Sequence, residues 1–118
     1  MRFLSIYTHE AKNAAPPTPE LMAAMGKLIE EGMKAGWLLA TEGIQAGTAG
    51  VRVKSAGGKV TITDGPFAEA KEVLGGYALL QAKSKDEAIE LGRKFLKVAG
   101  DGVCEMHQLY EMPPGSPR

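Results

Sequence analysis

The stretch Asp64-Gly65-Pro66-Phe67, followed by Ala68-Glu69-Ala70-Lys71-Glu72-Val73-Leu74-Gly75-Gly76-Tyr77, lies at the pivot of the chain. Aspartate can accept a hydrogen bond from a nearby backbone N–H, glycine tolerates a positive φ, and proline fixes φ at about −65° and lacks a backbone donor. The first residues of the stretch therefore predict a turn. In the simplest interpretation, Asp64 closes an Asx-type turn and Phe67 fills the end of a core.

Strand and helix patterns alternate on either side of this turn. Before it, the sequence predicts a strand over residues 2–8, a helix over 18–35, a short strand over 37–41, and the two strands of a hairpin over 51–54 and 59–63. After it, we expect a short helical turn over residues 67–74, a strand over 76–83, a helix over 84–99 and a last strand over 103–111. The order is therefore strand, helix, strand, hairpin, strand, helix, strand.

Both helices carry residues that favour their ends. Thr18 suits the N-cap of the first helix, Pro19 suits its first helical position, and Gly36 ends it. Ser84 and Glu87 have the spacing of a capping box at the start of the second helix. The apolar stripe of the first helix, which we interpret as core-facing, consists of Leu21, Met22, Met25, Leu28, Ile29 and Met33, and that of the second consists of Ala88, Leu91, Gly92, Phe95 and Ala99.

This order predicts an α+β fold of the ferredoxin-like kind, in which both helices cover one face of an antiparallel sheet and a β-hairpin is inserted. The strand over residues 2–8 carries apolar side chains on both faces, so neither face of the sheet should be fully exposed to solvent. We expect the face without helices to carry Phe3, Tyr7, Tyr77, Leu79 and Leu109, which is too much apolar area to leave in water. A second copy of the chain is expected to cover this face, which gives a homodimeric α+β barrel.

Length and composition restrict the class of protein. The 118 residues suit a single domain, expected over residues 1–112, with a flexible proline-rich tail over 113–118. Fourteen basic and fourteen acidic side chains give a net charge of zero, which favours neither direct nucleic-acid binding nor an anionic membrane. Cys104 has no partner for a disulfide, and neither a signal peptide nor an apolar run of membrane-spanning length is recognisable. We therefore expect a soluble, cytoplasmic protein.

The residues that could carry chemistry gather on the predicted open face of the sheet. The sequence has no paired cysteines, no His-Glu-x-x-His, no phosphate-binding glycine loop and no Gly-x-Ser-x-Gly, and we expect neither a metal nor a cofactor. Strand alternation places Ser5, Tyr7 and His9 on the face of Phe3, and Glu105 and His107 on one face of the last strand. With Asp64 and Tyr77, they could line a cavity between two sheets. The predicted site therefore has Asp64 and His107 as catalytic candidates, and Tyr7, His9, Phe67, Tyr77 and Glu105 as ligand-binding candidates.

Each of these residues also has a simpler interpretation. A histidine can be an ordinary hydrogen-bonded or loop residue, and Glu105 can pair with Arg2 or Lys54 across strands. Cys104 falls on the opposite strand face from His107, so we interpret it as a small buried hydrophobic residue rather than a nucleophile.

The stretch from Thr63 to Tyr77 resembles the signature of the DGPF proteins, a branch of the YCII-related family. The resemblance extends to Glu42-Gly43-Ile44 and to the order of elements, and it implies the dimeric α+β barrel fold. Members of the branch commonly have Glu-Val-Arg-Pro on the last strand, where this chain has Glu105-Met106-His107-Gln108. The guanidinium that could hold an anion there is thus replaced by an imidazole.

For YCII-type proteins the resemblance also implies a His-Asp pair suggestive of hydrolytic or dehydrochlorinating chemistry, with the histidine on the first helix. The first helix of this chain contains no histidine, and Asp64 alone could stand for the aspartate. Three hypotheses follow: a homodimer that binds a small molecule between its sheets, a lyase or hydrolase that uses Asp64 with His107 or His9, and a regulatory module associated with alternative sigma factors. Whether the protein is an enzyme is left open.

Overall fold

A computed structural model of the chain describes residues 1–10, 17–45, 50–65 and 72–111. Its elements are β1 (Arg2–Glu10), α1 (Pro19–Ala35), β2 (Leu38–Gly43), β3 (Val51–Ala56), β4 (Lys59–Asp64), β5 (Glu72–Gln81), α2 (Lys85–Ala99) and β6 (Val103–Gln108). The larger sheet has the strand order β2-β5-β1-β6 with antiparallel pairs, and β3 and β4 form a separate two-stranded sheet. The predicted ferredoxin-like α+β fold is confirmed.

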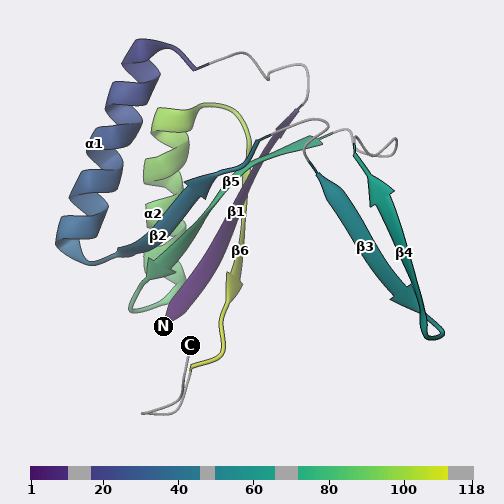
Figure 1. Cartoon of the computed structure of the whole chain (residues 1–118). Helices are drawn as coiled ribbons and strands as arrows, with labels where there is room; N and C mark the ends of the chain where they lie inside the picture. Colours follow the sequence, from purple (N-terminus) through teal and green to yellow (C-terminus); the bar gives the residue numbers. More distant parts are fainter. Residues whose placement is uncertain (11–16, 46–49, 66–71, 112–118) are drawn as a thin grey trace.

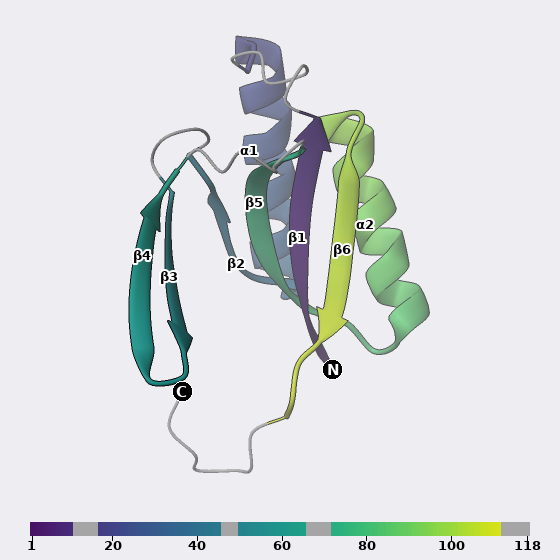
Figure 2. The ribbon, with the colours of Figure 1, turned by 90° about the vertical axis from the view of Figure 1, so that its right-hand side faces the viewer.

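The two helices cover one face of the larger sheet, and the β3–β4 hairpin projects on the other side (Figure 1). After a quarter turn the hairpin lies to the left of the sheet, and the fainter helices lie behind the sheet (Figure 2). We call the sheet face without helices the open face. In the described residues, neither helix is long and apolar enough to cross a membrane.

The helix ends follow the capping predictions. The Thr18 hydroxyl accepts a hydrogen bond from the Leu21 N–H at 3.1 Å, and Gly36 ends α1 with φ of 86°. A positive φ of this size favours glycine because a Cβ would be crowded. At α2 the Ser84 hydroxyl accepts from the Glu87 N–H at 3.1 Å, while the Glu87 carboxylate accepts from the Lys83 N–H at 3.2 Å. The capping box is therefore present, but its return bond reaches one residue before the N-cap.

Several predicted strand boundaries were wrong. β5 begins at Glu72 instead of residue 76, because Val73 and Leu74 pair with β1, so the short helical turn expected over 67–74 is not formed at 72–74. Residues 67–71 of that expected turn lie outside the described residues. β6 ends at Gln108 instead of residue 111, although the N–H of Leu109 still donates to the Arg2 carbonyl at 2.9 Å. β2 covers Leu38–Gly43 rather than 37–41.

The assignment of β1 to the two sheet faces was also wrong. Phe3 is only 5% exposed and belongs to the core beneath the helices, with Leu38, Leu80, Ala82 and Ala88. Tyr7 lies on the same side, because its ring meets Phe95 of α2 edge-on at 5.1 Å. Tyr77 and Leu79 do lie on the open face, since they pair with Ile6 and Leu4, the β1 residues that alternate with Phe3 and Tyr7. Leu109 lies beyond the end of β6.

Only part of the predicted stripe of α1 reaches this core. Leu28 is buried, whereas Met22 is 62% and Met33 is 50% exposed. The face of α1 that contacts the sheet is therefore narrower than its apolar sequence pattern. On α2 the prediction was better, because Ala88 and Gly92 are buried and Leu91 packs against the core.

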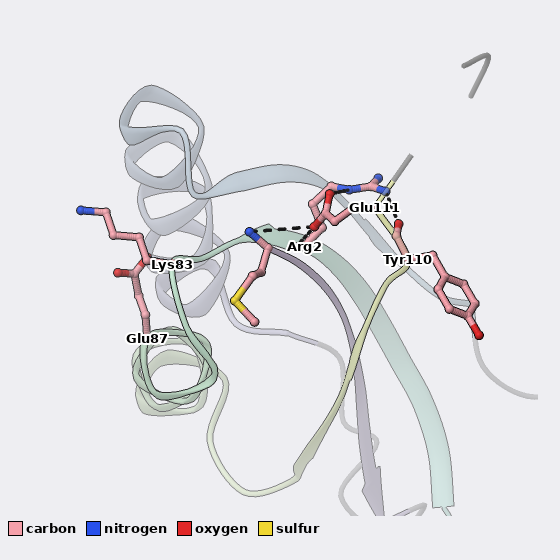
Figure 3. A network of polar contacts seen from close by, with 6 residues as sticks. Arg2, Lys83, Glu87, Tyr110 and Glu111 are labelled. Atoms are coloured by element: carbon pink, nitrogen blue, oxygen red, sulfur yellow. Dashed lines mark hydrogen bonds and ion pairs between the residues drawn. The ribbon is translucent and has the colours of Figure 1, made fainter. Parts of the chain in front are cut away.

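The ends of β1 and β6 are joined by a small polar network (Figure 3). The Arg2 guanidinium donates to the carbonyl of Tyr110 at 2.9 Å, and its Nε lies 3.8 Å from the Glu111 carboxylate. The backbone N–H of Arg2 also donates to Glu111, at 3.2 Å. The first and last strands are thus connected by side chains as well as by their ladder.

Candidate functional site: a cavity between the helices and the sheet

A cavity of about 370 Å³ lies between α1, α2 and the helix-covered face of the sheet. Both helices and three strands contribute apolar walls to it, among them Leu28, Ile29, Trp37, Leu80, Leu91 and Phe95. Gly92 of α2 and Ala78 of β5 also line it, and these small residues leave the volume unfilled. The cavity therefore exists because the two helices are placed over small residues near its centre.

Three hydroxyl groups supply polarity to this apolar cavity. Ser5, Tyr7 and Thr41 line it, and Ser5 is only 7% exposed. The Thr41 hydroxyl donates to the Tyr77 carbonyl at 2.9 Å, so the hydroxyl oxygen keeps acceptor capacity. Among the described residues that line the cavity there is no lysine, arginine or histidine; Glu42 and Tyr77 also border it, but their register positions place these two side chains on the open face. The walls thus suit a neutral, largely apolar molecule that donates one or two hydrogen bonds.

Tyr7 is fixed at one side of the cavity. Its hydroxyl donates to the backbone carbonyl of Asp101 at 3.0 Å, and its ring lies against Phe95 and against His9, at centroid distances of 5.1 and 5.7 Å. Burial raises the pKa of the Tyr7 hydroxyl, and the charges of Cys104 and Asp101 raise it further. Tyr7 is therefore a neutral, oriented group and not a base.

Glycines provide the space for the Tyr7 ring. Gly75 falls at the bulge where the register between β1 and β5 shifts, and a Cβ there would lie 2.6 Å from the Tyr7 ring atom Cδ2. At Gly102 a Cβ would lie 2.8 Å from the carbonyl oxygen of Thr8 and would also overlap the ring. Contacts this short are not tolerated by real Cβ atoms, so both positions require glycine for the ring to lie where it does.

The structure divides the predicted site residues between the two faces of the sheet. Tyr7 and His9 share the side of the helices, and the His9 Nδ1 donates to the Glu10 carbonyl at 3.1 Å. Tyr77, Glu105 and His107 have their register positions on the open face. Tyr7 and His9 therefore do not share a sheet face with the other three residues, whereas the cavity expected between two sheets required all five on the open face.

On the open face, Glu105 and His107 form a close pair. The His107 Nε2 lies 2.7 Å from a Glu105 carboxylate oxygen, and both side chains are exposed. The alternative pairing of Glu105 with Arg2 was wrong, because the Arg2 guanidinium is directed to Glu111 and Tyr110 instead.

Asp64 and Phe67 are not brought to these groups. Asp64 is the last residue of β4, where it is exposed and pairs with Val51. β4 ends near the top of the molecule in Figures 1 and 2, whereas β6, which carries His107, ends at the lower edge of the sheet. Phe67 lies outside the described residues, so its role in ligand binding stays a prediction.

Cys104 follows its predicted interpretation. It is half-buried, pairs with Tyr7 across the strands and therefore lies on the opposite face from His107. Burial raises the pKa of the thiol, and a hydrogen bond with Ser5 offsets part of this rise. In the described part of the chain, no three His, Cys, Asp or Glu side chains are grouped so that they could hold a metal ion.

Sequence reasoning missed Thr41, Trp37 and Phe95 as cavity residues. Thr41 and Trp37 lie in or beside a short strand whose burial depends on its pairing with β5, which the sequence alone did not give. Phe95 was assigned to the core stripe of α2, and the small residues Ala88 and Gly92 on the same stripe were the available signal for unfilled space.

Comparison with known proteins identifies the family. The model of the YCII-related domain matches residues 1–113. The chain is also 35% identical, over 69 residues, to an uncharacterised protein of Rhizobium meliloti (strain 1021). That match covers 58% of this chain and 56% of the relative, so the chain spans little more than half of the relative's length. Because the family model matches nearly the whole sequence, the chain belongs to the YCII-related family.

Proposed function

We propose that this protein binds a neutral, largely apolar small molecule in the cavity between α1, α2 and the sheet, and that it works as a homodimer. The observation that carries the proposal is the cavity itself. Its volume of about 370 Å³ lies within the range of small-molecule sites, about 300–1,000 Å³. Its apolar walls and few hydroxyls have the composition of such sites, in which isolated polar groups orient the ligand.

A cavity-filling substitution tests the binding proposal. Ala78 lines the cavity, so Ala78→Met inserts a flexible side chain into it, and Ala24→Met places the same side chain on the exposed surface of α1 as a control. We expect neutral 2-naphthol to raise the melting temperature of the unmodified protein and of the control, and anionic 2-naphthoate to have a much smaller effect. An equal 2-naphthol effect in the Ala78→Met protein would show that the molecule binds elsewhere.

The open face supports the dimer. Its register gives two cross-strand rows, Glu42–Tyr77–Ile6–Glu105 and Ala40–Leu79–Leu4–His107. The centre of both rows is apolar, and three of the four margin residues, Glu42, Glu105 and His107, are polar or charged, which is the usual arrangement of a protein interface. We expect Leu79→Arg to produce monomers with native far-UV circular dichroism, measured by size-exclusion chromatography with light scattering. A dimer unaffected by this substitution contradicts an open-face interface.

The turn sequence Asp64-Gly65-Pro66-Phe67 supports placing the chain in the DGPF branch of the family. This finer assignment does not change the test of binding, because the cavity is built from residues outside that turn.

A second candidate function is a lyase or hydrolase, and the Glu105–His107 pair favours it. A carboxylate 2.7 Å from an imidazole can fix the tautomer and the orientation of the ring, as a general acid or base requires. Asp64 can join this pair only from another subunit, because within one chain β4 and β6 end far apart. If the proposal holds, Glu105→Gln and His107→Gln lower the same activity and alter its pH profile. A reaction with unchanged kinetics in both variants contradicts it.

A further inference from the structure

The β3–β4 hairpin, residues 51–64, has an apolar face that no described residue covers, and we call this hairpin the arm. Cross-strand pairing puts Val51, Val53, Val60 and Ile62 on one face, because Val53 lies opposite Ile62 and Val60 lies opposite Ser55. Their exposed fractions are 56, 66, 59 and 70%. Four neighbouring β-branched side chains are therefore in water in the isolated chain.

An arm of this kind needs a partner to be stable. A two-stranded hairpin alone is marginally stable in water, and it usually packs against a third strand, a helix or another layer. The radius of gyration is 16.4 Å, whereas a compact chain of this length has about 13–14 Å, so the arm extends away from the body. The cover of its apolar face must therefore come from outside the described part of this chain.

The position of the arm indicates where that cover lies. In Figures 1 and 2 the arm projects on the side of the open face, opposite the helices. A second copy seated on the open face would thus lie beside the arm. By two-fold symmetry, the arm of that second copy would lie beside the first chain in the same way.

The apolar and the basic side chains of the arm lie on opposite faces. Arg52, Lys54 and Lys59 alternate with the apolar residues, and the single acid, Asp64, lies on the apolar face opposite Val51. The open face of a second copy offers an apolar centre, formed by Leu4, Ile6, Tyr77 and Leu79. Packing of the apolar face on a second copy therefore matches apolar surface with apolar surface and leaves the basic face in water.

We propose that the arm is an intersubunit clasp, whose apolar face packs on a second copy of this chain at the margin of the open face. The inference rests on the proposed homodimer and adds a specific contact to it. In the assembled pair, each arm covers the partner and is itself held in place by that contact.

Photo-crosslinking from the arm tests the contact directly. Ile62→p-benzoylphenylalanine places a reactive group on the apolar face, and the same change at Thr63 places it on the opposite face as a control. The modified chain is mixed with an unmodified chain labelled with ¹⁵N and irradiated. We expect the Ile62 group to join peptides of the labelled chain from β1, β5, β6 or β2, and the Thr63 group to do so far less. Crosslinks confined to one chain, or equal crosslinking from both positions, overturn the clasp.

A second measurement separates failure of the clasp from failure of the dimer. Ile62 is 70% exposed in the single chain, so Ile62→Lys should leave the fold of the subunit intact, and Thr63→Lys is its matched control. We expect Ile62→Lys to raise the dimer dissociation constant about tenfold or more in sedimentation velocity, with no change for Thr63→Lys. If Leu79→Arg yields monomers while Ile62→Lys changes nothing, the dimer stands and the clasp is wrong. If neither substitution has an effect, both proposals are wrong.

Discussion

Replacing Gly32 of α1 by alanine is expected to leave the protein about 1–3 kcal/mol less stable to unfolding than the same replacement at Gly26 of the same helix. At Gly32 an alanine Cβ would lie 2.7 and 2.8 Å from the ring atoms Cη2 and Cζ2 of Trp37, and 2.9 Å from the Cβ of Leu38. Neither neighbour can yield easily, since the indole is rigid and the Leu38 Cβ is fixed to the backbone of β2. A Cβ at Gly26 would have no heavy atom within 4 Å apart from the neighbouring backbone of α1.

The two substitutions share the gain in helix propensity, about 1 kcal/mol for glycine to alanine. Gly26→Ala is therefore expected to stabilise the protein by about that amount, and the difference between the variants isolates the crowding at Gly32. Gly92→Ala on α2 is a further comparison, because its Cβ would meet only Met106, with the terminal methyl carbon at 2.6 Å. That flexible end can turn away, so Gly92→Ala should resemble Gly26→Ala.

Urea unfolding followed by far-UV circular dichroism measures these differences, with all variants at one protein concentration because of the proposed dimer. For a domain of this size, 1 kcal/mol corresponds to a shift of about 4 °C in melting temperature. In a Trp37→Phe background, which lacks the indole atoms Cζ2 and Cη2, the penalty at Gly32 should shrink. Equal stability of Gly32→Ala and Gly26→Ala in the native background would refute the reasoning.

Three further predictions concern single polar groups. Tyr7→Phe removes the donor to the Asp101 carbonyl and should lower the free energy of unfolding by about 0.5–1.5 kcal/mol, measured with urea; an unchanged value contradicts the hydrogen bond. Lys94 donates a hydrogen bond to the Glu31 carboxylate at 2.8 Å, and this bond together with the charge of Lys94 lowers the pKa of Glu31 below the ordinary 4.5. The pair therefore stabilises the folded state at pH values above 4.5, and this contribution is lost as the pH falls through the lowered pKa of Glu31. Lys94→Met should therefore flatten the pH dependence of stability in acid, and an identical profile in both proteins would contradict this. Burial raises the pKa of Cys104, so its thiol should react with a disulfide reagent more slowly in the folded protein than in urea, and faster as pH rises; equal rates would show an accessible thiol.

Local signals in the sequence were sufficient for the two helices with their ends and for the order of the elements, whereas the ends of several strands were not predicted correctly. Thr18, Gly36 and Ser84 each bind or bend the backbone within three or four residues, so their roles do not depend on the rest of the fold. The signal for the hairpin was equally local, because apolar and polar residues alternate in the two strands on either side of the Gly57–Gly58 turn. The order of these elements then left few ways to build one layered domain.

The faces of β1 could not be assigned in this way. Phe3, Ser5 and Tyr7 on one side and Leu4 and Ile6 on the other are similar in apolar content, so alternation alone did not select the side of the helices. The register with β5 selects it, because Phe3 lies opposite Leu80 and Ser5 lies opposite Ala78. Register is a long-range property, and the predicted site depended on it. Because β1 was assigned to the wrong sheet face, Tyr7 and His9 were grouped with Tyr77, Glu105 and His107, which lie on the other side of the sheet.

The network of Arg2 with Tyr110 and Glu111 keeps the two ends of the folded body beside each other. A short linker from residue 111 to residue 1 can therefore join them, and new ends can be opened at the exposed Gly57–Gly58 turn. In such a circular permutant β3 and β4 become separate terminal segments, while β2, β5, β1 and β6 keep their neighbours. The connectivity of this protein thus allows the refolding of its four-stranded body to be measured apart from that of its hairpin.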